Sequence, residues 1–195
     1  FYGFLKNKDK TIGFIYEFMC NGSLKSYVTS NRSKIDETFS LRTINRIFQG
    51  IEYLHSRCLI YRDLKPSNIL LDHDFIPYIS DFETIRQLND DAENGQENFT
   101  NDIGSLIYAS PEQYKGKMIS YSTDIYSFGL IIYFLYESDD MMKFISKNND
   151  YAIQFQSNIS DNLQKVIINC IKIKQEERMD HREIKSVLIE ETRSL

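Results

Sequence analysis

The stretch that decides the fold of this chain is residues 61–68, which read Tyr-Arg-Asp-Leu-Lys-Pro-Ser-Asn, with an Asp-Phe-Glu tripeptide a little further along. Moving a phosphoryl group requires an acceptor for the proton of the attacking hydroxyl, oxygen ligands for Mg²⁺ and a cation near the moving charge. Asp63 can be the acceptor and Lys65 the cation, and the side chains of Asn68 and Asp81 can hold the metal. The spacing of these residues therefore favours phosphoryl-transfer chemistry.

The composition is that of an ordinary globular protein with one core. The chain has 195 residues, of which 42% are hydrophobic and 26% are charged, and nothing in it indicates a second domain. The formal net charge of −5 argues against a nucleic-acid-binding protein, which would present a basic face.

The cysteines and the apolar runs favour a cytoplasmic protein without a membrane span. Cys20, Cys58 and Cys170 are far apart and not in a metal-binding spacing, so we expect reduced, buried thiols. The longest apolar run, residues 128–136, is too short to cross a bilayer. No signal peptide is present, but the chain starts with Phe1 inside a strand-like stretch, which is compatible with a protein that begins further upstream.

The first third of the chain predicts a hairpin and then helices. Residues 1–5 and 11–18 are strand-like and flank a polar turn. A short helix should begin at Leu24, and Ser40 is the expected N-cap of a long helix. That helix should bury one stripe of side chains at helical spacing, namely Ile44, Ile47, Phe48, Ile51 and Leu54.

The middle of the chain predicts a small hairpin, a loop and a buried helix. Residues 69–71 and 77–79 flank an Asp-His-Asp turn. Residues 84–103 are polar and acidic, which indicates a mobile loop, and a loop this long is usually functional. Residues 124–136 are apolar around the whole circumference and predict a helix buried on every side.

The end of the chain predicts two amphipathic helices. The first should bury Leu163, Val166, Ile167, Cys170 and Ile171. The second should open with a capping box between Asp180 and Glu183 and bury Ile184, Val187 and Leu188.

The motifs that follow the 61–68 stretch occur in a familiar order. They are Gly104-Ser105, Tyr108, Ser110-Pro111-Glu112, the run Asp124-Ile125-Tyr126-Ser127-Phe128-Gly129, and Arg178. Together they make the chain resemble, nearly from end to end, a eukaryotic protein kinase of the serine/threonine or tyrosine-kinase-like group. An unrelated helical domain would require this order to be a coincidence, and we set that alternative aside.

The resemblance implies an α+β, protein-kinase-like fold. Residues 1–19 would be the last strands of the β-rich N-lobe and the hinge, and residues 20–195 the mainly helical C-lobe. Residues 81–112 would be the activation segment. The glycine loop of the family, its phosphate-holding lysine and the glutamate partner of that lysine are expected before Phe1, so these residues alone should bind ATP poorly.

The resemblance also assigns roles to residues of the candidate site. Asp63 would accept the proton of the substrate hydroxyl and Lys65 would lie beside the transferred phosphate, while Asn68 and Asp81 would bind Mg²⁺. Ser105 would contact Asp63 and Lys65; otherwise it is a simple loop hydroxyl.

Three further residues are implied to be structural. Glu112 and Arg178 would form a buried ion pair that ties the activation segment to the later helices. Asp124 would accept backbone N–H bonds from residues 61–68, a role that is compatible with ordinary N-capping.

On the nucleotide side, the resemblance places Tyr16 at the back of the adenine pocket. The main chain of Glu17 and Met19 would contact adenine, and Leu70 would pack beneath the ring. Apart from the resemblance, all four are strand and core residues.

Regulation is implied by Arg62, which in the family goes with phosphorylation of the activation segment. Thr100 is a candidate acceptor, and an unmodified loop Thr is the alternative. The acidic residues of this loop could also mimic a phosphate permanently: Asp90, Asp91, Glu93, Glu97 and Asp102.

Some residues depart from the family pattern. Tyr61 and Tyr126 replace a usual His and Trp and are mild changes. Glu83 replaces a Gly that gives the metal-binding Asp freedom to move, so we expect it to slow or bias that movement. The short polar stretch before Leu163 lacks the usual Gly-x-x-Pro-Phe sequence, which puts substrate docking there in doubt.

Two functions follow. The first is an ATP- and Mg²⁺-dependent protein kinase that acts on Ser or Thr of a protein substrate. The second is a pseudokinase or truncated lobe that binds partner proteins as a scaffold, which Glu83 favours and the intact Asp63, Lys65, Asn68 and Asp81 oppose. Neither reading includes nucleic-acid or membrane binding.

Overall fold

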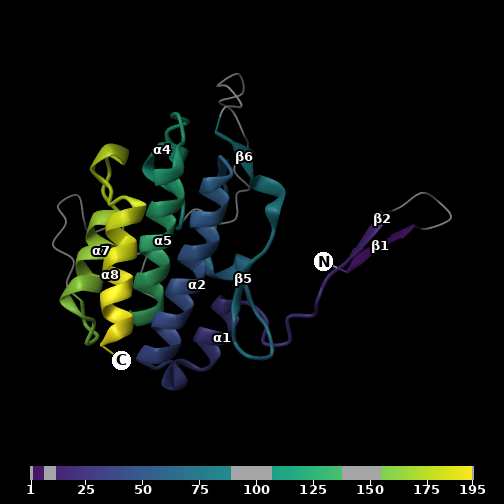
Figure 1. The fold of residues 1–195 in the computed structure, drawn as a ribbon, viewed down its shortest axis with the longest axis horizontal. Helices are drawn as coiled ribbons and strands as arrows, with labels where there is room; N and C mark the ends of the chain where they lie inside the picture. Colours follow the sequence, from purple (N-terminus) through teal and green to yellow (C-terminus); the bar gives the residue numbers. More distant parts are fainter. Residues whose placement is uncertain (1, 7–11, 89–106, 138–154, 195) are drawn as a thin grey trace.

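The computed structural model describes residues 2–6, 12–88, 107–137 and 155–194. The helices gather into one body, and a two-stranded hairpin near the N-terminus lies apart from that body (Figure 1). The described elements, with η marking a single turn of 3₁₀ helix, are β1 (Gly3–Lys6), β2 (Ile12–Ile15), α1 (Leu24–Ser30), η1 (Arg32–Lys34), α2 (Glu37–Ser56), β3 (Leu59–Ile60), η2 (Pro66–Asn68), β4 (Ile69–Leu71), β5 (Pro77–Ile79), η3 (Phe82–Thr84), β6 (Arg86–Gln87), α4 (Pro111–Tyr114), α5 (Tyr121–Tyr136), α7 (Asp161–Cys170), η4 (Gln175–Glu177) and α8 (His181–Arg193).

Helix α5 is the centre of the core, as its apolar circumference predicts. Its large side chains from Phe128 to Leu135 are no more than 8% exposed. The helix begins at Tyr121 and not at Asp124, because the N–H of Ser120 is held by Thr123 Oγ1 at 3.3 Å at the helix start. Asp124 therefore lies inside the helix, and the alternative that it caps this helix is wrong.

Helix α2 packs one stripe against α5. The five predicted side chains from Ile44 to Leu54 are all buried, and the rings of Phe48 and Phe128 lie 5.5 Å apart. The predicted N-cap is wrong, because Asp36 caps the helix by accepting the N–H of Phe39 at 2.7 Å. Ser40 lies within the first turn, where its hydroxyl donates back to the Asp36 carbonyl.

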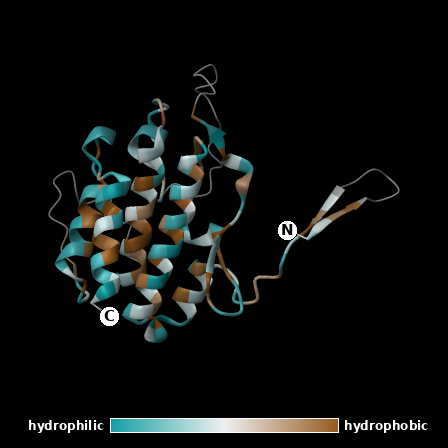
Figure 2. Ribbon diagram, in the orientation of Figure 1, coloured by the Kyte–Doolittle hydropathy of each residue, from teal (hydrophilic) through white to brown (hydrophobic). Residues whose placement is uncertain are grey.

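Helices α7 and α8 complete the helical layer. The predicted stripe of α7 is buried, and the predicted capping box of α8 is confirmed by the mutual bonds of Asp180 and Glu183. On α8, Ile184 and Leu188 are buried and Val187 is partly buried. Hydrophobic residues are concentrated where these helices face α5, and hydrophilic ones lie outside (Figure 2).

Three two-stranded antiparallel pairs accompany the helices. The N-terminal hairpin and the β4–β5 hairpin are confirmed, with Ile69 opposite Ile79 in the second, although β2 ends at Ile15 and not at residue 18. The β3–β6 pair was not predicted. It corrects the assignment of residues 84–88 to a loop, because Arg86 pairs with Ile60 of β3 and the Leu88 N–H donates to the Cys58 carbonyl at 2.8 Å. The described part of the chain ends at residue 88 here, so the rest of the predicted loop, up to residue 103, lies outside the described residues.

The cysteines differ from the prediction in their burial. Cys170 is buried between α7 and α5, and burial raises the pKa of its thiol, but Cys20 and Cys58 are exposed. All three are free thiols, as expected. Within the described ranges, no helix combines the length and the apolar character needed to span a membrane.

Candidate active site

The predicted catalytic residues meet on the 61–68 loop, between β3 and β4. Lys65 Nζ lies 2.7 Å from Asp63 Oδ2, and Asn68 Nδ2 donates to the same oxygen at 2.9 Å and to the Asp63 carbonyl at 3.0 Å. The turn η2 brings Asn68 back to Asp63. The Asp63 carboxylate is therefore held in place by an ammonium group and an amide, and its side chain is 22% exposed.

The main chain of this loop is anchored to the core helix. Asp124, which is fully buried on α5, accepts the N–H of Tyr61 through Oδ2 and the N–H of Arg62 through Oδ1, both at 2.8 Å. His55 Nε2 also lies 2.8 Å from Asp124 Oδ2. The loop thus takes its position from the buried central helix α5.

Asp81 is brought toward Asn68 by the β4–β5 hairpin. Ser80, the preceding residue, donates from its N–H and from its hydroxyl to the Asn68 carbonyl, both at 2.9 Å. Asp81 itself is exposed and has φ 59° and ψ 73°, in the left-handed region. The β4–β5 pairing and the Ser80 hydroxyl together fix the position from which the Asp81 side chain extends.

Tyr61 contacts the residues on both sides of Asp81, Ser80 and Phe82. Its side chain is fully buried, its ring meets Phe82 edge to face at 6.0 Å, and its hydroxyl donates to the Ser80 carbonyl. Burial raises its pKa, and the charges of Asp63 and other nearby carboxylates add to that effect. A neutral tyrosine therefore holds the position before Arg62-Asp63.

The oxygen donors at this site fit a Mg²⁺ ion that keeps other ligands. Because Asn68 donates through Nδ2, its amide oxygen is the donor left for a metal, and Asp81 supplies a carboxylate. In the described part of the chain, no group of three or more His, Cys, Asp or Glu is placed to hold a metal by itself. Mg²⁺ is commonly bound by one or two carboxylates with waters and phosphate oxygens, so the donor set is suitable.

The residues assigned to adenine are only partly brought together. The Asn21 N–H bonds the Leu71 carbonyl and Ser23 bridges to Leu70, which places the 19–23 segment beside β4. Tyr16, by contrast, is 63% exposed and Glu17 is also exposed. This differs from the enclosed position that the resemblance implies, because β2 pairs only with β1 among the described strands.

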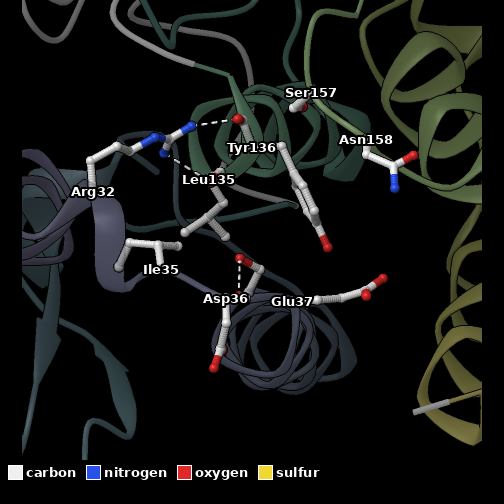
Figure 3. Close-up of a pocket in the computed structure, with 9 residues that line it drawn as sticks. Arg32, Ile35, Asp36, Glu37, Leu135, Tyr136, Ser157 and Asn158 are labelled. Atoms are coloured by element: carbon white, nitrogen blue, oxygen red, sulfur yellow. Dashed lines mark hydrogen bonds between the residues drawn. The ribbon is translucent and has the colours of Figure 1, made fainter.

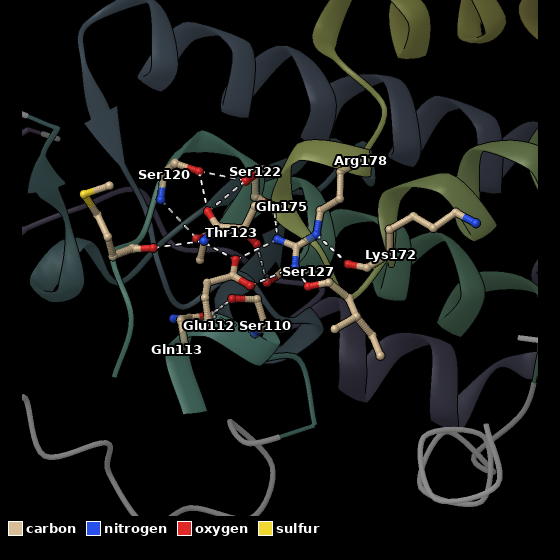
Figure 4. A network of polar contacts seen from close by, with 12 residues as sticks. Ser110, Glu112, Gln113, Ser120, Ser122, Thr123, Ser127, Lys172, Gln175 and Arg178 are labelled. Atoms are coloured by element: carbon tan, nitrogen blue, oxygen red, sulfur yellow. Dashed lines mark hydrogen bonds and ion pairs between the residues drawn. The ribbon is translucent and has the colours of Figure 1, made fainter. Parts of the chain in front are cut away.

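Glu112 and Arg178 form a bidentate ion pair, with N–O distances of 2.6 and 2.7 Å (Figure 4). Both side chains are almost fully buried. Burial pushes the pKa of Glu112 upward, but the hydrogen bonds and charge of Arg178 outweigh it and hold the pKa below its usual value. Thr123 donates to Glu112 and the Arg178 guanidinium lies over the Tyr126 ring, so the pair joins α4, α5 and the 172–178 segment.

A cavity of about 230 Å³ lies at the other end of α5 (Figure 3). Arg32 donates to the last carbonyls of α5 there, and the Tyr136 hydroxyl has no hydrogen-bond partner among the described residues. Burial, with Glu37 and Glu191 nearby, raises the pKa of Tyr136. Twelve residues of helix, about 18 Å, separate Tyr136 from Asp124, so this cavity is not part of the candidate active site.

Some of the predicted residues lie outside the described part of the chain. One residue of the site was not predicted from the sequence. Thr100, Ser105 and residues 138–154 of the stretch that lacks the docking sequence lie outside the described residues. Sequence reasoning missed His55, whose contact with Asp124 spans 69 positions and follows no short motif. The only available signal was a polar residue at the end of the apolar stripe of α2.

The comparison with known families settles the class of protein. A family model described as the protein kinase domain matches residues 1–188. The chain therefore belongs to the protein kinase domain family, and its mostly helical structure with small antiparallel sheets is consistent with that fold.

Curated relatives are receptor-like kinases of plants. A G-type lectin S-receptor-like serine/threonine-protein kinase of Arabidopsis thaliana is 38% identical over 135 residues, which cover 67% of this chain and 16% of the relative. A cysteine-rich receptor-like protein kinase of the same plant is 34% identical over 135 residues, 67% of this chain and 38% of the relative. A G-type lectin S-receptor-like serine/threonine-protein kinase of Oryza sativa subsp. indica is 36% identical over 141 residues, which cover 65% of this chain and 17% of the relative.

The aligned region spans well under half of each of these relatives. The cytoplasmic location expected from the sequence stays a prediction.

Proposed function

We propose that this chain carries the catalytic lobe of an ATP- and Mg²⁺-dependent protein kinase that phosphorylates Ser or Thr of a protein substrate. The observation that carries the proposal is the cluster of Asp63, Lys65 and Asn68, joined at 2.7–3.0 Å on a loop anchored to the core. In this proposal residues 1–19 end the N-lobe, residues 20–195 form the C-lobe and residues 81–112 are the activation segment.

The geometry supports a division of labour among these side chains. Asp63 Oδ2 orients the substrate hydroxyl and takes its proton, a role worth about 10²–10⁴-fold in rate. Lys65, already beside that oxygen, supplies positive charge near the transferred phosphate. Asn68 and Asp81 would hold Mg²⁺, which neutralises charge on the phosphate oxygens when bound. Tyr16, Glu17, Met19 and Leu70 contact the adenine ring in this proposal.

The choice of Ser or Thr as acceptor rests on Lys65 and on the relatives. A Lys two residues after the catalytic Asp resembles serine/threonine kinases, and two of the relatives above are named as serine/threonine-protein kinases.

The test is phosphate transfer from ATP to a generic basic protein substrate by the full-length protein that contains this chain. We expect Asp63→Asn to lower kcat by roughly 10²-fold or more, because the proton acceptor is lost. The matched control is Asp74→Asn in the exposed β4–β5 turn, which should leave kcat unchanged. Equal activity of Asp63→Asn and the wild type would contradict the proposal.

A binding scaffold is the second candidate, and Glu83 favours it. Glu83 is exposed in η3, two residues from Asp81, so it adds a carboxylate near the proposed metal ligands. A wild-type protein that transfers no phosphate, yet binds a partner equally well with and without Asp63→Asn, would support the scaffold instead.

A further inference from the structure

The main chain that leads into Asp63 is held by side chains on all of its polar groups. Asp124 takes the N–H groups of Tyr61 and Arg62. Thr84 Oγ1 donates to the Tyr61 carbonyl and Gln113 Nε2 donates to the Arg62 carbonyl, both at 2.8 Å. Every backbone donor and acceptor of these two residues is thus bound by a side chain from another element.

This support matters because Arg62 has an unfavourable backbone conformation. Its φ is 75°, in the left-handed region that residues with a β-carbon rarely adopt and keep only where the surroundings hold them there. The Arg62 carbonyl belongs to the peptide group that leads directly into Asp63. Its orientation therefore sets the starting point of the Asp63 side chain.

The two carbonyl-binding residues lie near the two ends of residues 81–112. Thr84 is in η3, directly after Glu83, and Gln113 follows Glu112 on α4. Gln113 is 4% exposed, and its Oε1 accepts from the N–H and hydroxyl of Ser110 at 2.9 and 3.2 Å. These two donors fix the amide so that its nitrogen faces the Arg62 carbonyl.

We propose that Thr84 and Gln113 are positioning residues that hold the backbone before Asp63 and so couple both ends of residues 81–112 to the catalytic aspartate. The assignment of catalysis to Asp63 rests on the proposed function. Movement of either end of this segment removes a hydrogen bond from Tyr61 or Arg62 and releases a backbone conformation that is otherwise disfavoured.

The chain offers variants that remove each hydrogen bond. Thr84→Val removes the hydroxyl at nearly constant shape, and Thr84→Ser restores it. Gln113→Glu keeps an oxygen for Ser110 but replaces the donor to Arg62 with a buried carboxylate oxygen, which repels the Arg62 carbonyl. Thr29→Val and Gln49→Glu are the matched controls, since both residues are exposed on helices α1 and α2.

The first measurement is amide hydrogen exchange of a peptide covering residues 59–66 in the full-length protein. We expect Thr84→Val and Gln113→Glu to accelerate exchange roughly three- to tenfold, the effect of one lost hydrogen bond, while Thr84→Ser and both controls match the wild type. Exchange of α5 should be unchanged, which excludes general unfolding as the cause. Exchange at 59–66 that stays within the range of the controls, or Thr84→Ser that behaves like Thr84→Val, would overturn the proposal.

The second measurement is steady-state phosphate transfer. We expect kcat to fall in Thr84→Val and Gln113→Glu with KM for ATP unchanged, because the proton acceptor is displaced and nucleotide contacts are not. Faster exchange with an unchanged kcat would overturn the positioning role. A wild-type protein without any activity would contradict the proposed function alone, since hydrogen exchange does not depend on catalysis.

Discussion

At the scale of single residues, Glu112 and Arg178 show what a buried charge requires in this protein. Each carboxylate oxygen of Glu112 meets a guanidinium nitrogen, and the guanidinium also donates to the carbonyls of Lys172 and Ser122. Removing one member of such a pair leaves the other charge buried without compensation, which costs more than the pair itself contributes.

We therefore expect Glu112→Gln to destabilise the protein by about 3–5 kcal/mol. The midpoint of urea unfolding, followed by circular dichroism, measures the change. Glu177→Gln is the control, because its ion pair with Lys174 is exposed to solvent and should contribute little. A Glu112→Gln midpoint equal to that of the control would show that the buried pair is not required for stability.

At the scale of elements, Gly129 determines how closely α5 and α7 approach. A β-carbon at this position would lie 2.6 Å from Cys170 Cβ and 3.0 Å from Ile171 Cγ2. The Cβ of Cys170 is bonded directly to the main chain and the Cγ2 of Ile171 lies only one bond further out, so neither atom can move far without shifting the end of α7. Gly50 on α2 is different, because its β-carbon would meet the terminal Cδ1 of Ile79 at 2.8 Å, and that methyl can rotate away.

We expect Gly129→Ala to destabilise the protein by about 1–3 kcal/mol through overpacking. Gly50→Ala should be neutral or stabilising, since Ala is favoured over Gly in a helix by about 1 kcal/mol. Thermal unfolding of the two variants beside the wild type tests both. Similar shifts for the two variants would contradict the packing explanation.

Helices were the part of the fold that the sequence predicted best. Burial follows directly from hydrophobic periodicity. The spacing of Ile44, Ile47 and Ile51 therefore predicts the buried face of α2, and the uniform apolarity of α5 predicts that this helix is buried on every side. The start of α2 was misplaced since both Asp36 and Ser40 are good N-caps, and only the geometry shows which one meets a free N–H. The β3–β6 pair was missed because two-residue strands carry no periodic pattern.

At the scale of the whole molecule, His55 and His181 link distant elements to the 61–68 loop. The two imidazoles meet at 2.7 Å between His55 Nδ1 and His181 Nε2, and His55 in turn contacts Asp124. This chain of contacts connects α2, α8 and α5. Around His181 lie Asp180 at the start of α8, Glu52 and the Phe48 ring on α2, and Asp124 on α5, so both charges and an aromatic face surround it.

Burial, followed by repulsion from His55, lowers the pKa of His181, while Glu52, Asp180 and Asp124 act in the opposite direction. The folded protein therefore binds this proton less readily than the unfolded chain, and protonation favours unfolding. We expect stability to be greatest above the unfolded-state pKa of about 6.5 and to decline as the pH falls below it.

Urea unfolding at pH 7.5 and 5.5 measures this decline. His181→Gln should reduce the difference between the two pH values, and His73→Gln, an exposed histidine, should not. An unchanged difference in His181→Gln would show that the decline has another origin.

The candidate site could be predicted only in part, because some of its residues lie close together in the sequence and others do not. Asp63, Lys65 and Asn68 fall within one short motif, so their proximity is encoded locally, and the resemblance also identified Asp124, Glu112 and Arg178. The supports Thr84, Gln113 and His55 each act across 23 to 69 positions and belong to no motif. Their side chains are common polar types whose role depends on what the fold places opposite them.

The Arg32 contact at the end of α5 has a consequence for the order of folding. Its guanidinium donates to the carbonyls of Phe134, Leu135 and Tyr136, more than 100 positions later in the chain. Closing so long a loop costs conformational entropy before the contact returns any stability. During synthesis Arg32 leaves the ribosome long before α5 does, so the last carbonyls of the central helix gain this partner only after both halves of the chain have come together.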